Sequence, residues 1–179
     1  MSYTPEELIL SGYKARKAGR PEQAKEIFSQ AVRWSRQVAD SALLASSLVG
    51  LGQIERDLNH TDVALRHYRE AVDILRTSPH QLRFAHAIRH LADILRENGS
   101  PEDAVHCYVE ALNVYREHAE TPPLDLANTL RGFALLKGDV GDKEEAKSLW
   151  QEARSLYHLV NVQAGVKESE RQIARLMAT

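Results

Sequence analysis

The residues whose types and spacing come closest to a chemical site are two histidines and an aspartate. His86, His90 and Asp93 follow one another at i, i+4 and i+7, which places them on one face of a predicted helix. Histidines four residues apart can share a metal ion. The outer two residues, however, lie about 10 Å apart along a helix axis, and no acidic general-base motif accompanies them. We therefore expect no metal site here.

Other candidates for catalysis are equally weak. The single cysteine, Cys107, excludes an intrachain disulfide and a multi-cysteine metal site, and we expect it to be a buried or half-buried side chain rather than a nucleophile. The glycine-rich segment 137–142 lacks the Gly-Lys-Ser/Thr end of a phosphate loop and the aspartate spacing of a calcium loop. These observations predict a protein that is not an enzyme and that holds no cofactor and no metal.

Composition narrows the class of protein. The chain has 179 residues, which fits one domain or a short repeat array. Lys and Arg number 23 against 25 Asp and Glu, a net charge of −2, which argues against nucleic acid as a partner. The longest charge-free stretch, residues 41–54, is too short and polar to span a bilayer, and no signal peptide is visible. We expect a soluble cytoplasmic protein with no membrane partner.

An internal repeat organises the chain. Four segments read alanine, three residues, an aromatic residue, two residues, alanine, and their register advances by about 40 residues each time. The i, i+4, i+7 spacing puts the three residues on one helical face, where the alanines admit a neighbouring helix and the aromatic ring fills the space beside it. The four aromatic residues are Phe28, Tyr68, Tyr108 and Trp150.

Each of these segments follows a tight turn, so each repeat should hold two helices. Glycine or asparagine in the turn suits a left-handed helix end, and proline suits the first turn of the next helix. Ser100 is a candidate N-cap, and Asp142 with Glu145 indicates a capping box. Small residues stand where paired helices should cross, at Gly12, Gly52, Ala92 and Ala134. The predicted helices span residues 5–18, 21–38, 41–58, 61–77, 80–98, 101–119, 124–138, 143–160 and 162–177, and no stretch alternates like a strand.

These features resemble the tetratricopeptide repeat. The small-residue crossing at 88–95, the turn at 99–102 and the helix that follows carry the likeness, and the repeat of about 40 residues resembles the longer-helix variety rather than the usual 34. The resemblance implies an all-α fold, a right-handed α-solenoid of four helical hairpins plus a C-terminal capping helix. We expect a single domain, 1–179, with repeats at about 5–39, 40–78, 79–121 and 122–160 and a capping helix at 162–177.

The resemblance also implies a function. Members of the family hold a partner peptide or helix in a concave groove lined by the first helix of each repeat, so we expect a non-catalytic protein–protein interaction module or adaptor. Arg16, Arg56 and Arg96 share one phase of the repeat, and Arg89 and Arg131 share another. Guanidinium groups pair well with carboxylates, which favours an acidic protein or peptide partner. The expected groove residues are Tyr13, Arg16, Val49, Gln53, Arg56, His86, Arg89, Asp93, Arg96, Asn128, Arg131 and Leu135.

Three alternatives stand beside this interpretation. The arginines could be solvated and paired with neighbouring carboxylates, namely Glu55, Asp57, Asp93, Glu97 and Asp139. The chain could be a structural module that self-associates into a homo-oligomer, or a regulatory subunit that senses a peptide. The groove hypothesis predicts that reversing the charge of Arg89 and Arg131 leaves the fold intact and abolishes binding of an acidic partner.

Overall fold

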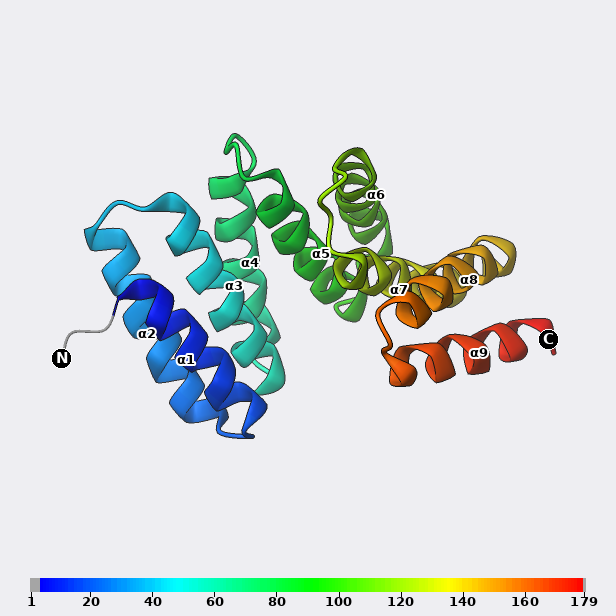
Figure 1. Cartoon of the computed structure of the whole chain (residues 1–179), viewed down its shortest axis with the longest axis horizontal. Coiled ribbons are helices and arrows are strands. Elements are labelled where there is room, and N and C mark those ends of the chain that lie inside the picture. The colour runs from blue at the N-terminus through cyan, green and yellow to red at the C-terminus, as the bar shows by residue number, and fades with distance from the viewer. Residues whose placement is uncertain (1–3, 179) are drawn as a thin grey trace. The chain divides into compact units, whose positions relative to one another are not determined.

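The computed structural model describes residues 4–178 of the chain, and within them it contains helices joined by short turns (Figure 1). The helices of this part are α1 (Pro5–Lys17), α2 (Pro21–Gln37), α3 (Ser41–Asp57), α4 (Thr61–Leu75), α5 (Gln81–Glu97), α6 (Pro101–Glu117), α7 (Pro123–Asp139), α8 (Lys143–Leu159) and α9 (Gln163–Met177). Every predicted helix is present, with ends within two residues of the expected ones, and the described residues form no strand. The predicted all-α fold is confirmed.

The chain divides into two compact units, Met1–Ile94 and Leu95–Thr179, with the division inside α5. In the first unit, α1 packs against α2, α2 against α3 and α3 against α4, which makes two helical hairpins side by side (Figure 1). In the second unit, α7 packs against both α6 and α8, and α8 packs against α9. The single domain over the whole chain stays a prediction.

Residues with a left-handed backbone end most of the helices. Those predicted from the turns are Gly19, Asn59, Gly99 and Gly141, with φ between 63° and 86°. Ala39 and Asn161 adopt the same conformation, at φ 56° and 58°, in the junctions between repeats. An alanine in this region strains its Cβ, so the junction must be held by other bonds. Asp40 supplies one, because its carboxylate accepts a hydrogen bond from the backbone N–H of Leu43 at 2.9 Å.

Two of the predicted helix caps differ in detail. Ser100 precedes α6 but makes no side-chain capping bond. Asp142 accepts the backbone N–H of Glu145 at 3.3 Å, as the capping box requires. The Glu145 carboxylate, however, forms an ion pair with Lys137 of the preceding helix. This ion pair replaces the second hydrogen bond of the capping box, which would run from the backbone N–H of Asp142 to the Glu145 carboxylate. The full charge of Lys137 competes better for the carboxylate than a backbone N–H does.

In the first unit, the aromatic ring on the second helix of a repeat packs against glycines of the neighbouring first helices. Phe28 of α2 is fully buried. A Cβ added to Gly12 of α1 would lie 2.7 Å from its ring, and one added to Gly50 of α3 would lie 2.1 Å from it. Gly52 stands in the same relation to Tyr68 of α4, at 2.7 Å. The sequence predicted Gly12 and Gly52 as crossing points but missed Gly50.

The second unit packs in the same way, mostly with alanine in place of glycine. Ala134 of α7 is fully buried, as predicted for a crossing point, and Trp150 of α8 is 1% exposed. Tyr108 stacks on Phe133 with ring centroids 5.6 Å apart. Gly165 brings α9 onto α8, because a Cβ there would lie 2.5 Å from the Tyr157 ring.

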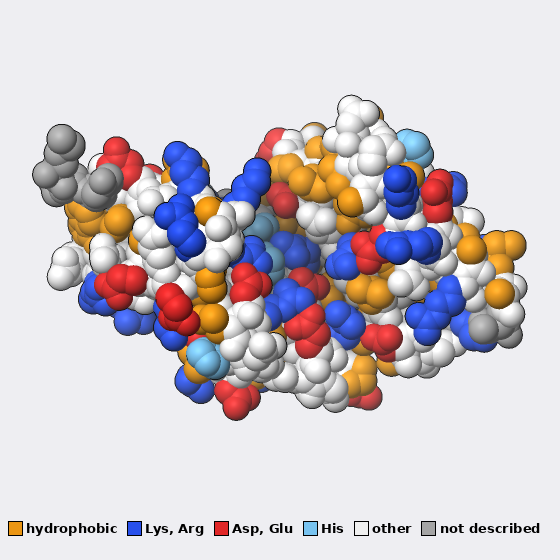
Figure 2. All heavy atoms as spheres, turned by 90° about the horizontal axis from the view of Figure 1, so that it is seen from below, with side chains coloured by type: hydrophobic (Ala, Val, Ile, Leu, Met, Phe, Trp, Pro, Cys, Tyr) orange, Lys and Arg blue, Asp and Glu red, His pale blue; other side chains and the backbone are white. Residues whose placement is uncertain are grey.

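The surface carries charges of both signs. On the face drawn in Figure 2, basic and acidic side chains are interspersed, in keeping with the net charge of −2. Among the described residues, none of the helices combines the length and the apolar character that crossing a membrane requires.

The glycine contacts predict a stability difference between two identical substitutions. Gly50→Ala should lower the free energy of unfolding by about 1–3 kcal/mol, because the new methyl group overpacks against Phe28. Gly138→Ala in α7 should be neutral or stabilising, because a Cβ there meets nothing within 4 Å. Urea denaturation of both variants measures the difference. Equal stabilities would show that Phe28 does not press on α3.

Candidate functional site

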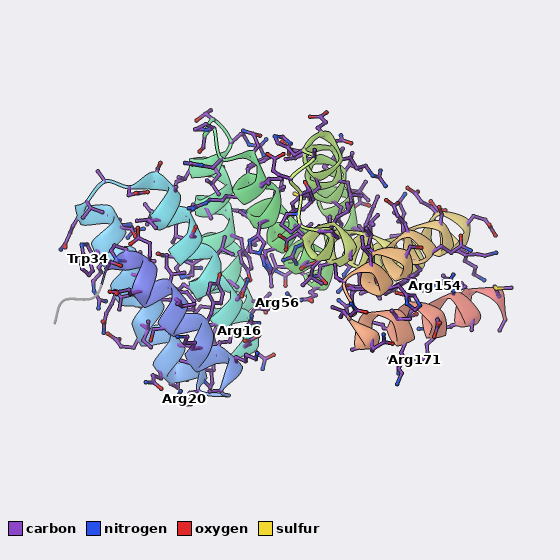
Figure 3. The ribbon with its side chains drawn as sticks, in the orientation of Figure 1. Arg16, Arg20, Trp34, Arg56, Arg154 and Arg171 are labelled. Carbon is purple, nitrogen blue, oxygen red and sulfur yellow. The ribbon has the colours of Figure 1, made fainter. Side chains whose placement is uncertain are left out.

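The first unit supplies eight of the predicted groove residues, all from the first helices of their repeats. Tyr13 and Arg16 lie on α1, Val49, Gln53 and Arg56 on α3, and His86, Arg89 and Asp93 on α5. Arg16 and Arg56 lie in the last turns of α1 and α3 (Figure 3).

A chain of hydrogen bonds joins these three helices. Arg16 donates from one terminal nitrogen (NH1) to Oε1 of Gln53 at 2.7 Å. Nε2 of Gln53 lies 2.8 Å from Nε2 of His90, and the NH2 nitrogen of Arg89 lies 2.7 Å from the same ring atom. Arg89 also donates from NH1 to Oδ2 of Asp93 at 3.0 Å. We call these five residues, with Arg56 and Asp57, the polar network.

The network fixes the protonation of its histidine. Gln53 accepts from Arg16 through Oε1, so its amide nitrogen faces His90 as a donor, and the guanidinium of Arg89 can only donate. Nε2 of His90 must therefore accept, which leaves a neutral ring with its proton on Nδ1. Burial and the charge of Arg89 lower the pKa of His90 well below its usual 6.5. The same two causes lower the pKa of His86 to about 3.

Two carboxylates balance part of the positive charge. Arg16 holds Asp57 through two nitrogens, at 2.6 and 3.1 Å. The NH1 nitrogen of Arg56 lies 3.8 Å from Oδ2 of Asp93, the same oxygen that Arg89 contacts. With the histidines neutral, the polar network brings together the guanidinium groups of Arg16, Arg56 and Arg89 and the carboxylates of Asp57 and Asp93.

Exposure differs between the predicted residues. Val49, Gln53 and Arg89 are only 3, 6 and 8% exposed. The sequence analysis expected these residues to line a groove, yet they are largely buried, because first helices also pack against one another, as α1 does against α3. The side chains of Arg16 and Arg56 remain 38 and 32% exposed, so they can still meet a partner.

The arginines of the second unit are paired as well. Arg131 holds Glu168 of α9 through two nitrogens, at 2.8 and 2.7 Å. Reversing the charge of Arg89 and Arg131 would place each new carboxylate beside an existing one, so we expect this change to destabilise the fold rather than to spare it. Pairing of the arginines with carboxylates named in the sequence analysis is observed for Arg16 with Asp57, for Arg56 and Arg89 with Asp93, and for Arg96 with Glu97 and Asp139.

The other two predicted residues of the second unit have separate surroundings. Asn128 accepts a hydrogen bond from the hydroxyl of Tyr157 at 2.8 Å. Leu135 lines a pocket of about 270 Å³ between α7, α8 and α9. The pocket combines apolar and charged walls, which include Trp150, Leu176, Asp139, Lys143 and Arg175.

The two histidines considered for a metal site pack against aromatic rings. The rings of His86 and His90 meet edge to face with centroids 4.8 Å apart, and His90 stacks on Tyr68 at 5.5 Å. Across residues 4–178, no group of three or more His, Cys, Asp and Glu side chains is arranged to hold a metal ion. Cys107 is half-buried, as expected.

Comparison with known families decides the class of the chain. The tetratricopeptide repeat family matches residues 12–77 and again residues 84–121. This chain is a tetratricopeptide-repeat protein. No curated protein matches its sequence. Tetratricopeptide repeats are in general non-catalytic interaction modules.

Solved structures share the fold of this tetratricopeptide-repeat protein at low sequence identity. BtubC (BKLC) from P. vanneervenii matches with a TM-score of 0.72 and 16% identity over 97% of this chain and 81% of its own. A Rap protein complexed with Competence and Sporulation Factor matches with a TM-score of 0.80 and 18% identity, over 94% of this chain and 47% of its own. A putative kinesin light chain from Podosopora anserina, with nearly identical TPR-like repeats, matches with a TM-score of 0.70 and 14% identity over 99 and 98%. The fold is thus an all-α helical-repeat solenoid.

The lowered pKa of His86 predicts how stability depends on pH. The unfolded chain binds a proton at His86 near pH 6.5, whereas the folded chain resists it until about pH 3. The contribution is therefore complete above pH 6.5 and is lost as the pH falls toward 3. In His86→Gln, the fall of unfolding free energy with acid should be shallower by up to about 1.4 kcal/mol per pH unit. Urea denaturation across this range measures it, with exposed His158→Gln as the control, and an unchanged slope would contradict a neutral ring at His86.

Proposed function

We propose that this tetratricopeptide-repeat protein is a non-catalytic interaction module that binds an acidic segment of a partner protein on α1, α3 and α5. The observation that carries the proposal is the polar network, which gathers three guanidinium groups on α1, α3 and α5 and leaves two of them partly exposed. Guanidinium groups held in place by hydrogen bonds on these helices, and partly exposed at Arg16 and Arg56, favour a partner with carboxylate side chains.

The exposed and the buried arginines would contribute to binding in different ways. Arg16 and Arg56 have side chains exposed enough to contact the partner, and each presents a planar fork that suits a carboxylate. Arg89 is buried and stays bound to His90 and Asp93, so it raises the positive potential without moving. Because the network already orders these side chains, binding immobilises few of them, which lowers its entropic cost.

A protein or peptide partner is supported by the family and by one solved neighbour. The Rap protein of similar fold is complexed with Competence and Sporulation Factor. That likeness favours a second candidate function, a regulatory subunit that senses a peptide. The present chain spans 47% of the Rap chain, so this candidate concerns the recognition step alone.

The test selects ligands without assuming an identity. A library of short random peptides is panned against the protein, and the enriched sequences should be rich in Asp and Glu. Their affinity should fall about tenfold or more in the Arg16→Gln/Arg56→Gln double variant and should weaken with added salt. The matched control is Arg33→Gln/Arg36→Gln, which removes two exposed charges from α2 in the same unit.

Two results would contradict this proposal. Enriched peptides without acidic residues would remove the charge argument, and acidic peptides that bind the Arg16→Gln/Arg56→Gln variant as tightly as the original would move the site off α1 and α3. Circular dichroism and urea denaturation of each variant show that any loss of binding is not a loss of fold.

A further inference from the structure

For Gly138 in the second unit, neither the backbone conformation nor the packing explains why the residue is glycine. Gly19, Gly99 and Gly141 need their positive φ, and Gly12, Gly50, Gly52 and Gly165 stand against aromatic rings. Gly138 does neither, because it lies in the last turn of α7 without a positive φ and a Cβ there would meet nothing within 4 Å. Gly138 instead lines the pocket between α7, α8 and α9.

The size of the pocket decides what kind of group it can take. Its volume is about 270 Å³. A cavity of about 150 Å³ holds a benzene ring, whereas sites for drug-sized ligands and cofactors start near 300 Å³. The pocket is therefore large enough for one side chain of a partner. The absence of a side chain at Gly138 leaves the wall open for this group.

The walls indicate the chemistry of that side chain. The pocket is lined by half-buried Leu135 and Leu176, with the largely buried Trp150 beneath them. Apolar walls of this kind favour an aliphatic group, because burial removes its surface from water.

The charged wall residues indicate what should stand beside the aliphatic group. Lys143 begins α8, so a positive charge borders the pocket. The one acidic wall residue, Asp139, accepts a hydrogen bond from Arg96 at 3.2 Å. The charges at this edge thus complement a partner with acidic residues.

We propose that the pocket between α7, α8 and α9 receives a leucine or methionine side chain from a partner segment in which acidic residues flank that side chain. The site lies wholly within the second unit and does not depend on the polar network of the first. It adds an apolar anchor to an interaction module for which only charge recognition was expected.

The test uses the full chain carrying Trp34→Phe, which leaves Trp150 as the remaining tryptophan. The probe is a blocked peptide of sequence Gly-Asp-Leu-Glu-Gly, and the readout is the fluorescence of Trp150. We expect a saturable change in emission. Replacing leucine by alanine in the peptide, or the acidic residues by lysine, should weaken binding about tenfold or more.

Variants of the protein locate the site. Gly138→Leu should fill the pocket and weaken binding about tenfold or more, whereas Gly138→Ala should stay within about twofold of the parent. Gly138→Gln serves as a second filling variant if circular dichroism shows that the leucine disturbs the fold. Lys143→Glu should weaken binding several-fold, and Lys167→Glu, on an exposed position of α9 away from the pocket, should not.

The proposal is overturned by any of three results. The first is no saturable change in emission at millimolar peptide. The second is equal affinity for the leucine and alanine peptides, or for the acidic and lysine peptides. The third is undiminished binding in a folded Gly138→Leu or Gly138→Gln variant.

Discussion

The close seating of Phe28 between two glycines is the contact on which the first unit depends. With no Cβ at Gly12 or Gly50, α1 and α3 both approach the ring of α2, and so they also approach each other. One helical turn further along lie Arg16 on α1 and Gln53 on α3, four and three residues after those glycines. Their hydrogen bond of 2.7 Å is therefore a consequence of the packing beneath it. The core sets the distance across which the polar side chains can bond.

The polar network in turn determines the electrostatics of the surface. A buried guanidinium such as Arg89 would be costly alone, because desolvation of a charge is offset only by close partners. Asp93 provides the opposite charge at 3.0 Å, and a neutral His90 provides an acceptor without adding a second positive charge. Because burial keeps the His90 ring neutral, no second positive charge adds to the desolvation cost of the buried Arg89. The exposed ends of the network, Arg16 and Arg56, carry the charge outward.

The fold was accessible from the sequence because it repeats. Four copies of one alanine and aromatic pattern specify the same helical hairpin, and each copy corrects the uncertainty of the others. Gly50 was missed because the pattern shows which residues face the second helix of the same repeat, whereas Phe28 also reaches the next one. Contacts between successive repeats depend on helix spacing, which one repeat does not encode.

The candidate site was accessible only in part for the same reason. The sequence pointed to the arginines and to several of their carboxylate partners. Arg16 and Arg96 each have an equivalent position in the next repeat, and the aspartate that pairs with them, Asp57 or Asp139, comes one residue after that position. It did not predict that Gln53 and Arg89 converge on His90, because that requires side chains of α3 and α5 to meet at one ring nitrogen. The pocket beside Gly138 likewise arises from the spacing of three helices.

The most direct test of this account is the protonation state of His90, measured by nitrogen NMR on histidine labelled with ¹⁵N. The account predicts a neutral ring with its proton on Nδ1 and an unprotonated Nε2, retained when the pH falls below the usual histidine pKa of 6.5. An imidazolium signal at that pH, or a proton on Nε2, would contradict it, because neither form can accept from Gln53 and Arg89.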